Sequence, residues 1–190
     1  MKKKGLIIAI AIVAVVVIII GSLVSSYNGF VEMREQVSTA ASDISTQLQR
    51  RADLIPNFVE TVKGYSNYEQ STFTAVTEAR SAVMGADDVE EQAEASQRLD
   101  SAISIWVNAV TEAYPELKAN EQYRALQDEL SGTENRIATA RRDYNKAAKE
   151  YNTAIRKFPA NIVAGIFDFD SADYFEADAG TQNAPVIDFD

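Results

Sequence analysis

The sequence predicts an all-α protein: an antiparallel up-and-down four-helix bundle preceded by an N-terminal transmembrane helix. A long uncharged apolar run occupies the N-terminus, and four stripes of apolar residues follow it at helical spacing. Only 8 Gly and 4 Pro occur among 190 residues, which also favours helix. Short polar turns make successive helices antiparallel neighbours, so the four stripes are expected to be buried against one another.

The N-terminal segment, residues 1–26, is expected to be a basic end followed by a membrane anchor. Residues 5–31 carry no charge, and Gly5 to Val24 supplies the roughly 20 apolar residues that cross a bilayer core of about 30 Å. A cleaved secretory signal is the alternative, because a weak cleavage site follows at residues 24–26. The length of the apolar run favours a retained anchor.

Three lysines, Lys2 to Lys4, precede the apolar run and predict its orientation. Positively charged flanks stay in the cytoplasm, so the chain from residue 27 onward is expected outside it. The absence of Cys is compatible with an oxidising compartment.

The composition excludes several classes of chemistry. The chain has no His and no Cys, which rules out thiol nucleophiles, disulfides, zinc–thiolate sites, imidazole bases and a Ser-His-Asp triad. The net charge of −10 divides into +3, −6 and −7 over residues 1–26, 27–157 and 158–190. An acidic body repels phosphate backbones, so no nucleic acid partner is expected. We expect no catalytic residue, no metal and no cofactor.

The first two stripes predict two helices with a junction between them. The first stripe runs from Val31 to Ile55 on a helix that leaves the membrane without a break. At the junction Asp53 caps a new helix, and Pro56 lies in its first turn, where it loses no hydrogen bond. The second stripe ends near Gly85, a residue suited to a helix C-terminus.

The third and fourth stripes predict the other two helices of a bundle spanning residues 27–158. The third begins after the Asp87-Asp88 pair and stops near Pro115. The fourth runs from Tyr123 to Phe158 and keeps its phase across Gly132, so one continuous helix is preferred to a new start at a capping box there.

The chain beyond Pro159 loses helical spacing and divides into two parts. Residues 159–176 are expected to pack on the bundle through Ile166, Phe167, Tyr174 and Phe175. Residues 177–190 read as an acidic, disordered tail.

Candidate sites for chemistry are few, and each has a structural alternative. Asp168, Asp170 and Asp173 have the spacing of a calcium loop, but the Gly and Glu of an EF-hand are missing. Arg50 and Arg51 have the charge to hold phosphate head groups. Pairing with Asp53 or with acids of another helix is the favoured role.

The dipeptide Tyr-Asn recurs at Tyr27, Tyr144 and Tyr151, and the last two lie one heptad apart. Tyrosine at a helix seam with Asn beside it predicts hydrogen bonds across helices that fix their register.

These motifs carry a resemblance to a known family. Tyr27-Asn28, Arg50-Arg51 with Asp53 and Pro56, Glu78 with Arg80, Tyr114-Pro115 with Asn120, Glu134-Asn135, Arg141 with Tyr144-Asn145, Tyr151-Asn152 and Phe158-Pro159 occur in order. Together they resemble the LemA family over roughly residues 6–176. The residues given a structural part by this resemblance are Arg50, Arg51, Asp53, Pro56, Tyr65, Glu69, Tyr114, Pro115, Asn120, Glu134, Asn135, Arg141, Tyr144, Asn145, Tyr151 and Asn152.

The resemblance implies a bacterial single-pass protein of the cell membrane with a helical bundle and no established enzymatic activity. Some members of the family act in organising internal membranes. We therefore expect a membrane-anchored scaffold or interaction protein whose protein partners are unidentified, with a homo-oligomer as one option. An extracytoplasmic sensor with a separate signalling partner and a carboxylate enzyme of the cell wall are the alternatives.

Overall fold

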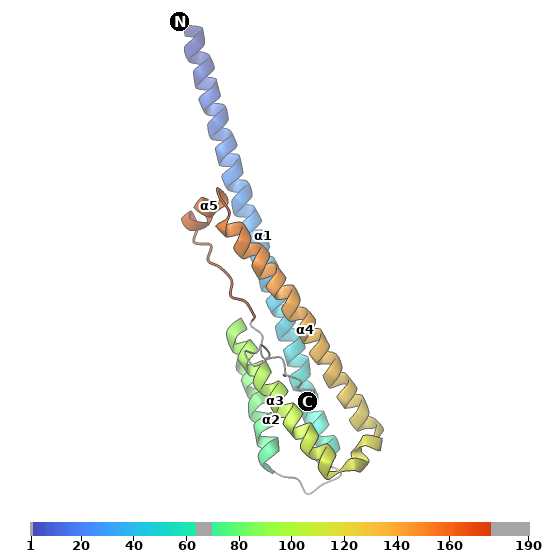
Figure 1. Ribbon diagram of the computed structural model, residues 1–190. Coiled ribbons are helices and arrows are strands. Elements are labelled where there is room, and N and C mark those ends of the chain that lie inside the picture. The colour runs from blue at the N-terminus through green and yellow to red at the C-terminus, as the bar shows by residue number, and fades with distance from the viewer. Residues whose placement is uncertain (1, 64–69, 176–190) are drawn as a thin grey trace, which may run out of the picture. The chain divides into compact units, whose positions relative to one another are not determined.

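The computed structural model describes residues 2–63 and 70–175, and over these ranges the chain forms helices and no strand. The elements in order are α1 (Lys2–Lys63), α2 (Gln70–Gly85), α3 (Val89–Ala113), the 3₁₀ helix η1 (Pro115–Ala119), α4 (Glu121–Arg156) and α5 (Ala160–Ile166), as Figure 1 shows. The all-α class and the long apolar N-terminal helix predicted from the sequence are confirmed.

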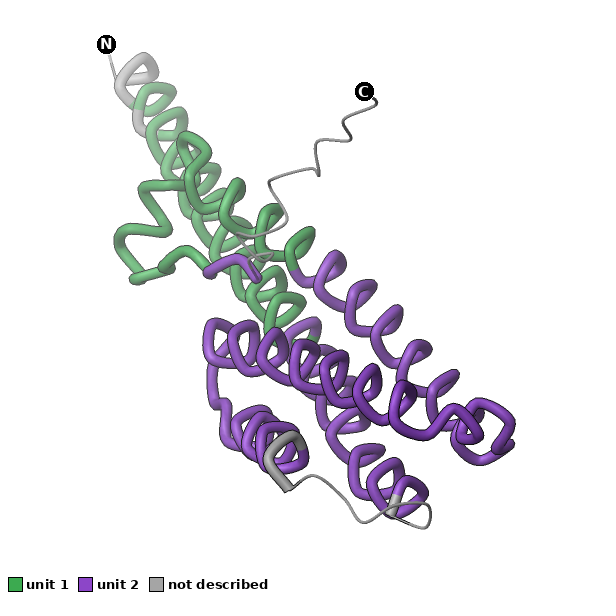
Figure 2. The backbone as a smooth tube through the Cα atoms, turned by 60° about the horizontal axis from the view of Figure 1, so that its bottom comes forward, with its two compact units in different colours: residues 1–39, 145–172 green, residues 40–144, 173–190 purple. Residues whose placement is uncertain are grey.

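The chain divides into two compact units, coloured separately in Figure 2. Unit 1 comprises residues 1–39 and 145–172, and unit 2 comprises residues 40–144 and 173–190. Helices α1 and α4 each contribute one stretch to unit 1 and another to unit 2.

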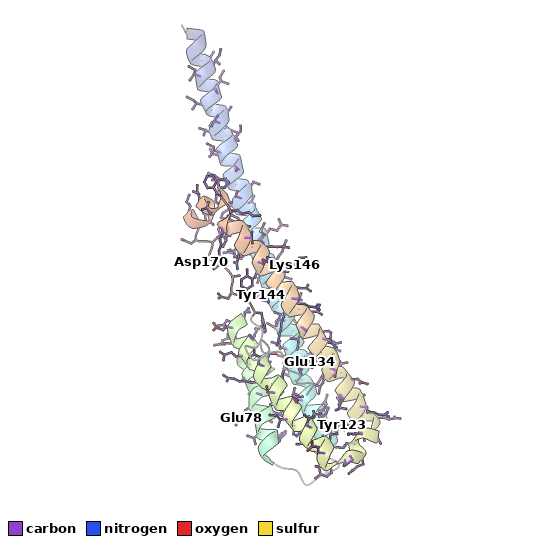
Figure 3. The ribbon with its side chains drawn as sticks, in the orientation of Figure 1. Glu78, Tyr123, Glu134, Tyr144, Lys146 and Asp170 are labelled. Atoms are coloured by element: carbon purple, nitrogen blue, oxygen red, sulfur yellow. The ribbon has the colours of Figure 1, made fainter. Side chains whose placement is uncertain are left out.

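The apolar stretch of α1 is exposed along its length. Large side chains between Leu6 and Val24 are between 39% and 70% accessible, and Figure 3 shows them projecting from the helix. Among the described residues this is the one helix long and apolar enough to cross a membrane.

The core of unit 1 joins the start of α1 to the end of α4 and to α5. Phe30 of α1, Tyr151 and Ile155 of α4, and Val163 and Ala164 of α5 are buried there. The apolar residues of both long helices recur at three- and four-residue steps, which puts them on one face of each helix.

The chain reverses after α5 through a tight C-terminal turn. The Phe169 amide donates to the Ala164 carbonyl at 3.0 Å, and Asp168 has a positive φ of 52°. This is the arrangement in which a left-handed residue ends a helix, a position that Asn and Asp tolerate better than most residues. The turn brings the Phe169 ring 5.3 Å from the ring of Phe30 and under the guanidinium of Arg34.

The core of unit 2 is built around three aromatic side chains. The ring of Phe58 in α1 lies 5.0 Å from Trp106 in α3 and 5.0 Å from Tyr123 in α4, and all three are at most 1% exposed. Helices α2 and α3 pack on each other in the same unit. Ile44, Leu48, Leu99, Ile103, Leu130 and Ile137 of the predicted stripes are buried, whereas Phe158, the predicted end of the fourth stripe, is 81% exposed and lies beyond the end of α4.

The predicted junction at residues 53–56 is wrong, because α1 continues through Pro56 to Lys63. Proline has no N–H, so the carbonyl four residues earlier, that of Ala52, loses its helical donor. Arg80 of α2 replaces it: its Nε donates to the Ala52 oxygen at 2.9 Å, and its Nη2 lies 3.8 Å from Asp53. A contact from another helix therefore supports the unbroken helix.

We expect Arg80→Ala to lower the free energy of unfolding by about 1.5 kcal/mol, the usual worth of a hydrogen bond from a charged donor. In a Pro56→Ala background the new amide supplies the Ala52 carbonyl, so the cost should fall below about 0.5 kcal/mol. Urea unfolding followed by Trp106 fluorescence measures the double-mutant cycle. Equal costs in both backgrounds would contradict this role for Arg80.

The ends of α3 and α4 follow their sequence signals. Asp88 caps α3 by accepting the Glu91 amide at 2.8 Å, as the Asp pair predicts. The side chain of Asn120 accepts the Tyr123 amide at 2.9 Å and so caps α4. Helix α4 runs through Gly132 without interruption, which confirms the continuous helix.

The segment after Pro159 differs from its prediction in two respects. It contains a helix, α5, where the sequence indicated none. Ile166, Phe167 and Tyr174 are exposed, whereas Phe169 and Phe175 are buried. The helix has only seven residues, too few for a helical stripe that the sequence pattern could reveal.

Candidate functional site

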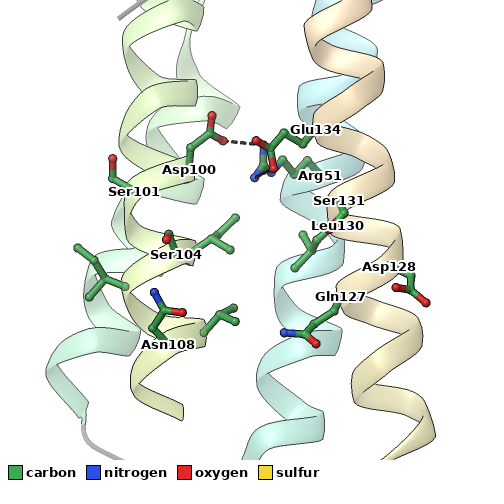
Figure 4. Close-up of a pocket in the computed structure, with 13 residues that line it drawn as sticks. Arg51, Asp100, Ser101, Ser104, Asn108, Gln127, Asp128, Leu130, Ser131 and Glu134 are labelled. Carbon is green, nitrogen blue, oxygen red and sulfur yellow. Dashed lines mark ion pairs between the residues drawn. The ribbon is translucent and has the colours of Figure 1, made fainter. Parts of the chain in front are cut away.

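A buried cation marks the most unusual part of unit 2. Arg51 of α1 is 4% exposed, and its Nη1 lies 2.6 Å from Oδ1 of Asp100 in α3. Its Nη2 lies 3.9 Å from Oε2 of Glu134 in α4, whose side chain is 65% exposed. Figure 4 shows Asp100 directed across at Arg51, with Glu134 beside it.

Burying this guanidinium is costly, and the geometry offsets the cost only in part. Moving a charge out of water costs several kcal/mol, which a close counter-ion and full hydrogen bonding can return. Among the described residues Nε and Nη1 of Arg51 and Oδ1 of Asp100 make no hydrogen bond, so Arg51 and Asp100 interact as an ion pair alone. The ion pair is thus better evidence of a specified arrangement than of extra stability.

A second arginine extends the cluster. Nη2 of Arg141 in α4 donates to the buried Ser96 hydroxyl of α3 at 2.5 Å, and its guanidinium lies 4.6 Å from the ring centre of Phe175. Burial lowers the pKa of Arg141, against the attraction of Asp100. Burial also raises the pKa of Asp100, and this effect exceeds the opposing attraction of Arg51 and Arg141.

A groove of about 850 Å³ opens beside the ion pair. Its polar lining between α3 and α4 consists of Ser101, Ser104, Asn108, Gln127, Asp128 and Ser131, with Arg51, Asp100 and Glu134 at one end (Figure 4). Hydroxyl and amide groups of this kind can bind a polar surface or ligand. The two carboxylates at that end of the groove, those of Asp100 and Glu134, pair with Arg51, so neither is a free acid or base.

Within the described ranges no three acidic side chains gather closely enough to hold a metal ion. The three candidate calcium ligands, Asp168, Asp170 and Asp173, are exposed.

Two side chains of the Tyr-Asn pairs, those of Tyr144 and Asn152, hold the extended chain after α5. In unit 1 the buried Asn152 donates from Nδ2 to the Ala172 carbonyl and accepts the Ala172 amide, both at 2.8 Å. In unit 2 the Tyr144 hydroxyl donates to the Asp173 carbonyl at 2.8 Å. Burial is the main cause that raises the pKa of both Tyr144 and Tyr151.

Asn152→Ala removes both bonds to Ala172, and we expect the Ala172 amide to exchange about 30-fold faster, which corresponds to about 2 kcal/mol of local stability. Asn152→Asp keeps the acceptor for that amide, so its effect should be smaller. Hydrogen exchange with mass spectrometry measures both, and Thr153→Ala is the exposed control. Unchanged exchange in Asn152→Ala would contradict the clamp.

The remaining family residues lie at helix ends or on the surface. Arg50 pairs with Glu129 of α4 at 2.8 Å, which confirms its predicted pairing with an acid of another helix. Tyr114 and Pro115 form the turn from α3 to η1. Asn135 is exposed and Asn145 is half-buried.

Two of the predicted residues, Tyr65 and Glu69, lie outside the described residues, as does the predicted tail at 177–190.

The sequence prediction missed Ser96 and Asp100, and it named Arg80 in a family motif without giving it a structural part. Ser96 and Asp100 occupy the helical stripe between Ala93 and Ile103, at three- and four-residue steps. A carboxylate on an apolar stripe indicates a buried partner and could have identified the pair with Arg51.

The fold and the site together define an all-helical protein with one apolar helix fit to cross a membrane and a buried ion pair that joins three helices. The chain belongs to the LemA family, because residues 40–189 match the sequence profile of that family. It is a membrane-associated helical protein.

Similar proteins extend the match to nearly the whole chain. Magnetosome protein MamQ 1 of Paramagnetospirillum magneticum is 30% identical over 97% of this chain and 77% of its own length. Protein LemA of Metamycoplasma hominis is 30% identical over 79% of this chain and 68% of its own. Magnetosome protein MamQ of Magnetospirillum gryphiswaldense is 27% identical over 96% and 75% of the two chains.

Proposed function

We propose that this protein is a single-pass membrane-anchored scaffold, which presents folded helices to protein partners and takes part in membrane organisation. One observation carries the proposal: a single helix, α1, holds both the fully exposed apolar stretch and the buried Arg51. An uncovered apolar stretch of this length fits a bilayer. Similarity to proteins named for the magnetosome adds support.

The proposed organisation keeps the boundaries predicted from the sequence. Residues 1–26 form the anchor, residues 27–158 an up-and-down four-helix bundle, residues 159–176 a segment packed on it, and residues 177–190 a tail. Contacts of α1 with α3 and α4 at Phe58, and of α1 with α2 at Arg80, support a bundle within unit 2. In this proposal the residues of the family motifs have a structural role in the fold.

The groove between α3 and α4 is the surface we propose for a protein partner. It is polar, and side chains of both helices reach it. The two carboxylates beside it pair with Arg51, an arrangement that favours a binding surface over a cell-wall enzyme. A sensor would use the same groove, with a separate signalling partner bound elsewhere.

Photo-crosslinking in intact membranes tests the scaffold. A benzophenone amino acid at Ser104 or Gln127, both in the groove, should form protein adducts of discrete mass that mass spectrometry identifies. The same group at Val16, in the apolar stretch, is the control for contacts inside the membrane. Absence of protein adducts from both groove positions would contradict the proposed surface.

We propose that the anchor lies in the bacterial cell membrane with the bundle outside the cytoplasm, as the lysines at its start predict. The chain has no Cys, so Ile105→Cys, at a position 64% exposed, gives a single reactive thiol. A membrane-impermeant maleimide should label it in intact spheroplasts. Labelling only after lysis would overturn this orientation.

A further inference from the structure

Unit 1 carries an uncovered apolar surface around α5. Ile162 and Ile166 are 51% and 63% exposed, and their four-residue spacing puts them on one face of the helix. Phe158 before the helix and Phe167 after it are 81% and 54% exposed. Four large apolar side chains are thus exposed within one short stretch of the chain, a feature typical of surfaces that contact a protein or a membrane.

The other face of α5 is already occupied. Val163 and Ala164 are 2% and 5% exposed, so α5 carries apolar side chains on its buried side as well as Ile162 and Ile166 on its exposed side, where Asn161 is the polar residue of the helix. Large apolar side chains on both sides of a helix are typical of one that a further surface covers. The exposed side therefore lacks its covering.

The position of this surface along α1 points to what covers it. The Phe167 ring lies 4.9 Å from the ring of Tyr27, in the same unit. Tyr27 follows the last residue of the apolar stretch, Val24, by three residues, or about 4.5 Å of helix. Head groups occupy about 5–7 Å on each side of the hydrocarbon core, and Tyr is enriched at that depth.

The charges beside α5 fit the same environment and limit its depth. Arg156 and Lys157 come directly before Phe158 and are exposed, as suits contact with anionic head groups. Asp168 and Asp170 follow Phe167 and are exposed. These carboxylates need water, so α5 lies in the interface and does not enter the hydrocarbon core.

We propose that the exposed face of α5, together with Phe158 and Phe167, docks on the bilayer surface beside the point where α1 leaves it. The protein then contacts the membrane twice: once through its span and once through this interfacial patch. The inference rests on the anchor of the proposed function. It adds a lipid-contacting surface that neither the span nor the groove contains.

Single-Cys variants of the full chain in phosphatidylcholine vesicles containing phosphatidylglycerol test the docking. A nitrobenzoxadiazole label at Ile162→Cys or Ile166→Cys should be quenched by lipid-borne nitroxide. Quenching by aqueous iodide should be at least about threefold weaker there than at Ile105→Cys, because an interfacial side chain is shielded from water. Ile105 is the matched control, since it is 64% exposed and lies in unit 2.

The two quenchers separate the outcomes. Loss of iodide quenching without nitroxide quenching at 162 and 166 would mean that another protein copy covers α5, and would overturn the proposal. Iodide quenching equal to that at position 105 would overturn it as well. A label at Val16→Cys tests the span independently: nitroxide quenching there, and not at 166, would leave the anchor standing and refute the docking alone.

Discussion

Asp100→Leu is expected to lower the free energy of unfolding by about 3 kcal/mol, because it leaves the buried Arg51 guanidinium without its closest counter-ion. Arg51 cannot lose its proton, so the variant keeps an uncompensated charge in the core. Glu134, 3.9 Å away and largely exposed, replaces little of the lost interaction. Urea unfolding of the full chain in detergent, followed by the fluorescence of Trp106, the single Trp, measures the loss.

Asp100→Asn should cost less than about 1 kcal/mol at neutral pH, because the carboxamide keeps a polar oxygen beside the Arg51 guanidinium. The raised pKa of Asp100 supports this, since it means that burial disfavours the ionised form in the folded state. Asp128→Leu removes an exposed acid of the same groove and should change stability by less than about 0.5 kcal/mol. Equal losses for the Asn and Leu variants would show that the negative charge of Asp100 is needed and that a polar oxygen beside Arg51 is not enough.

The pH dependence of the same two proteins follows from that pKa. A carboxyl with a raised folded-state pKa contributes stability that is fully present below its unfolded pKa, and the contribution is lost as pH rises through the folded pKa. Asparagine does not titrate. The difference in free energy of unfolding between the natural chain and Asp100→Asn should therefore move in favour of Asp100→Asn as pH rises from about 3.5 to about 7. A difference that moves in favour of the natural chain over this range would contradict the raised pKa of Asp100.

Elements with strong periodic signals were predictable from the sequence. The stripes that give α3 and α4 hold their phase over 25 and 36 residues, and the caps at Asp88 and Asn120 have the side chains that accept N-terminal amides. The class of fold and the pairing of the adjacent arginines with acids of other helices follow from such local patterns.

Features that depend on distant contacts were not predictable in the same way. Proline at position 56 reads as a helix start, and only the guanidinium of Arg80, 28 residues from Ala52, makes the continuous helix acceptable. The partners of Tyr144 and Asn152 are backbone groups of an extended segment, which has no periodicity to reveal its position. Pairing of Arg51 with an acid of another helix was expected, but Asp100 was not identified as that acid, because α1 and α3 meet only in the folded chain.

Phe58→Ala is expected to lower the free energy of unfolding by about 4 kcal/mol, in the range for removal of a fully buried aromatic ring. The ring is 0% exposed and contacts both Trp106 and Tyr123, so its loss leaves a cavity where α1, α3 and α4 meet. Trp106 reports directly on this site, and its emission should also shift to the red if water enters.

Two further variants show whether the effect of Phe58→Ala comes from its position. Phe58→Leu refills part of the cavity and should cost about 1–2 kcal/mol. Ile105→Ala removes an equally apolar side chain that is 64% exposed in the same unit and should change stability by less than about 0.5 kcal/mol. Because Phe58 follows Pro56 in α1, a small effect of Phe58→Ala would mean that α1 does not continue past the proline into the core. A loss of stability that decreases from Phe58→Ala to Phe58→Leu to Ile105→Ala would establish that it does.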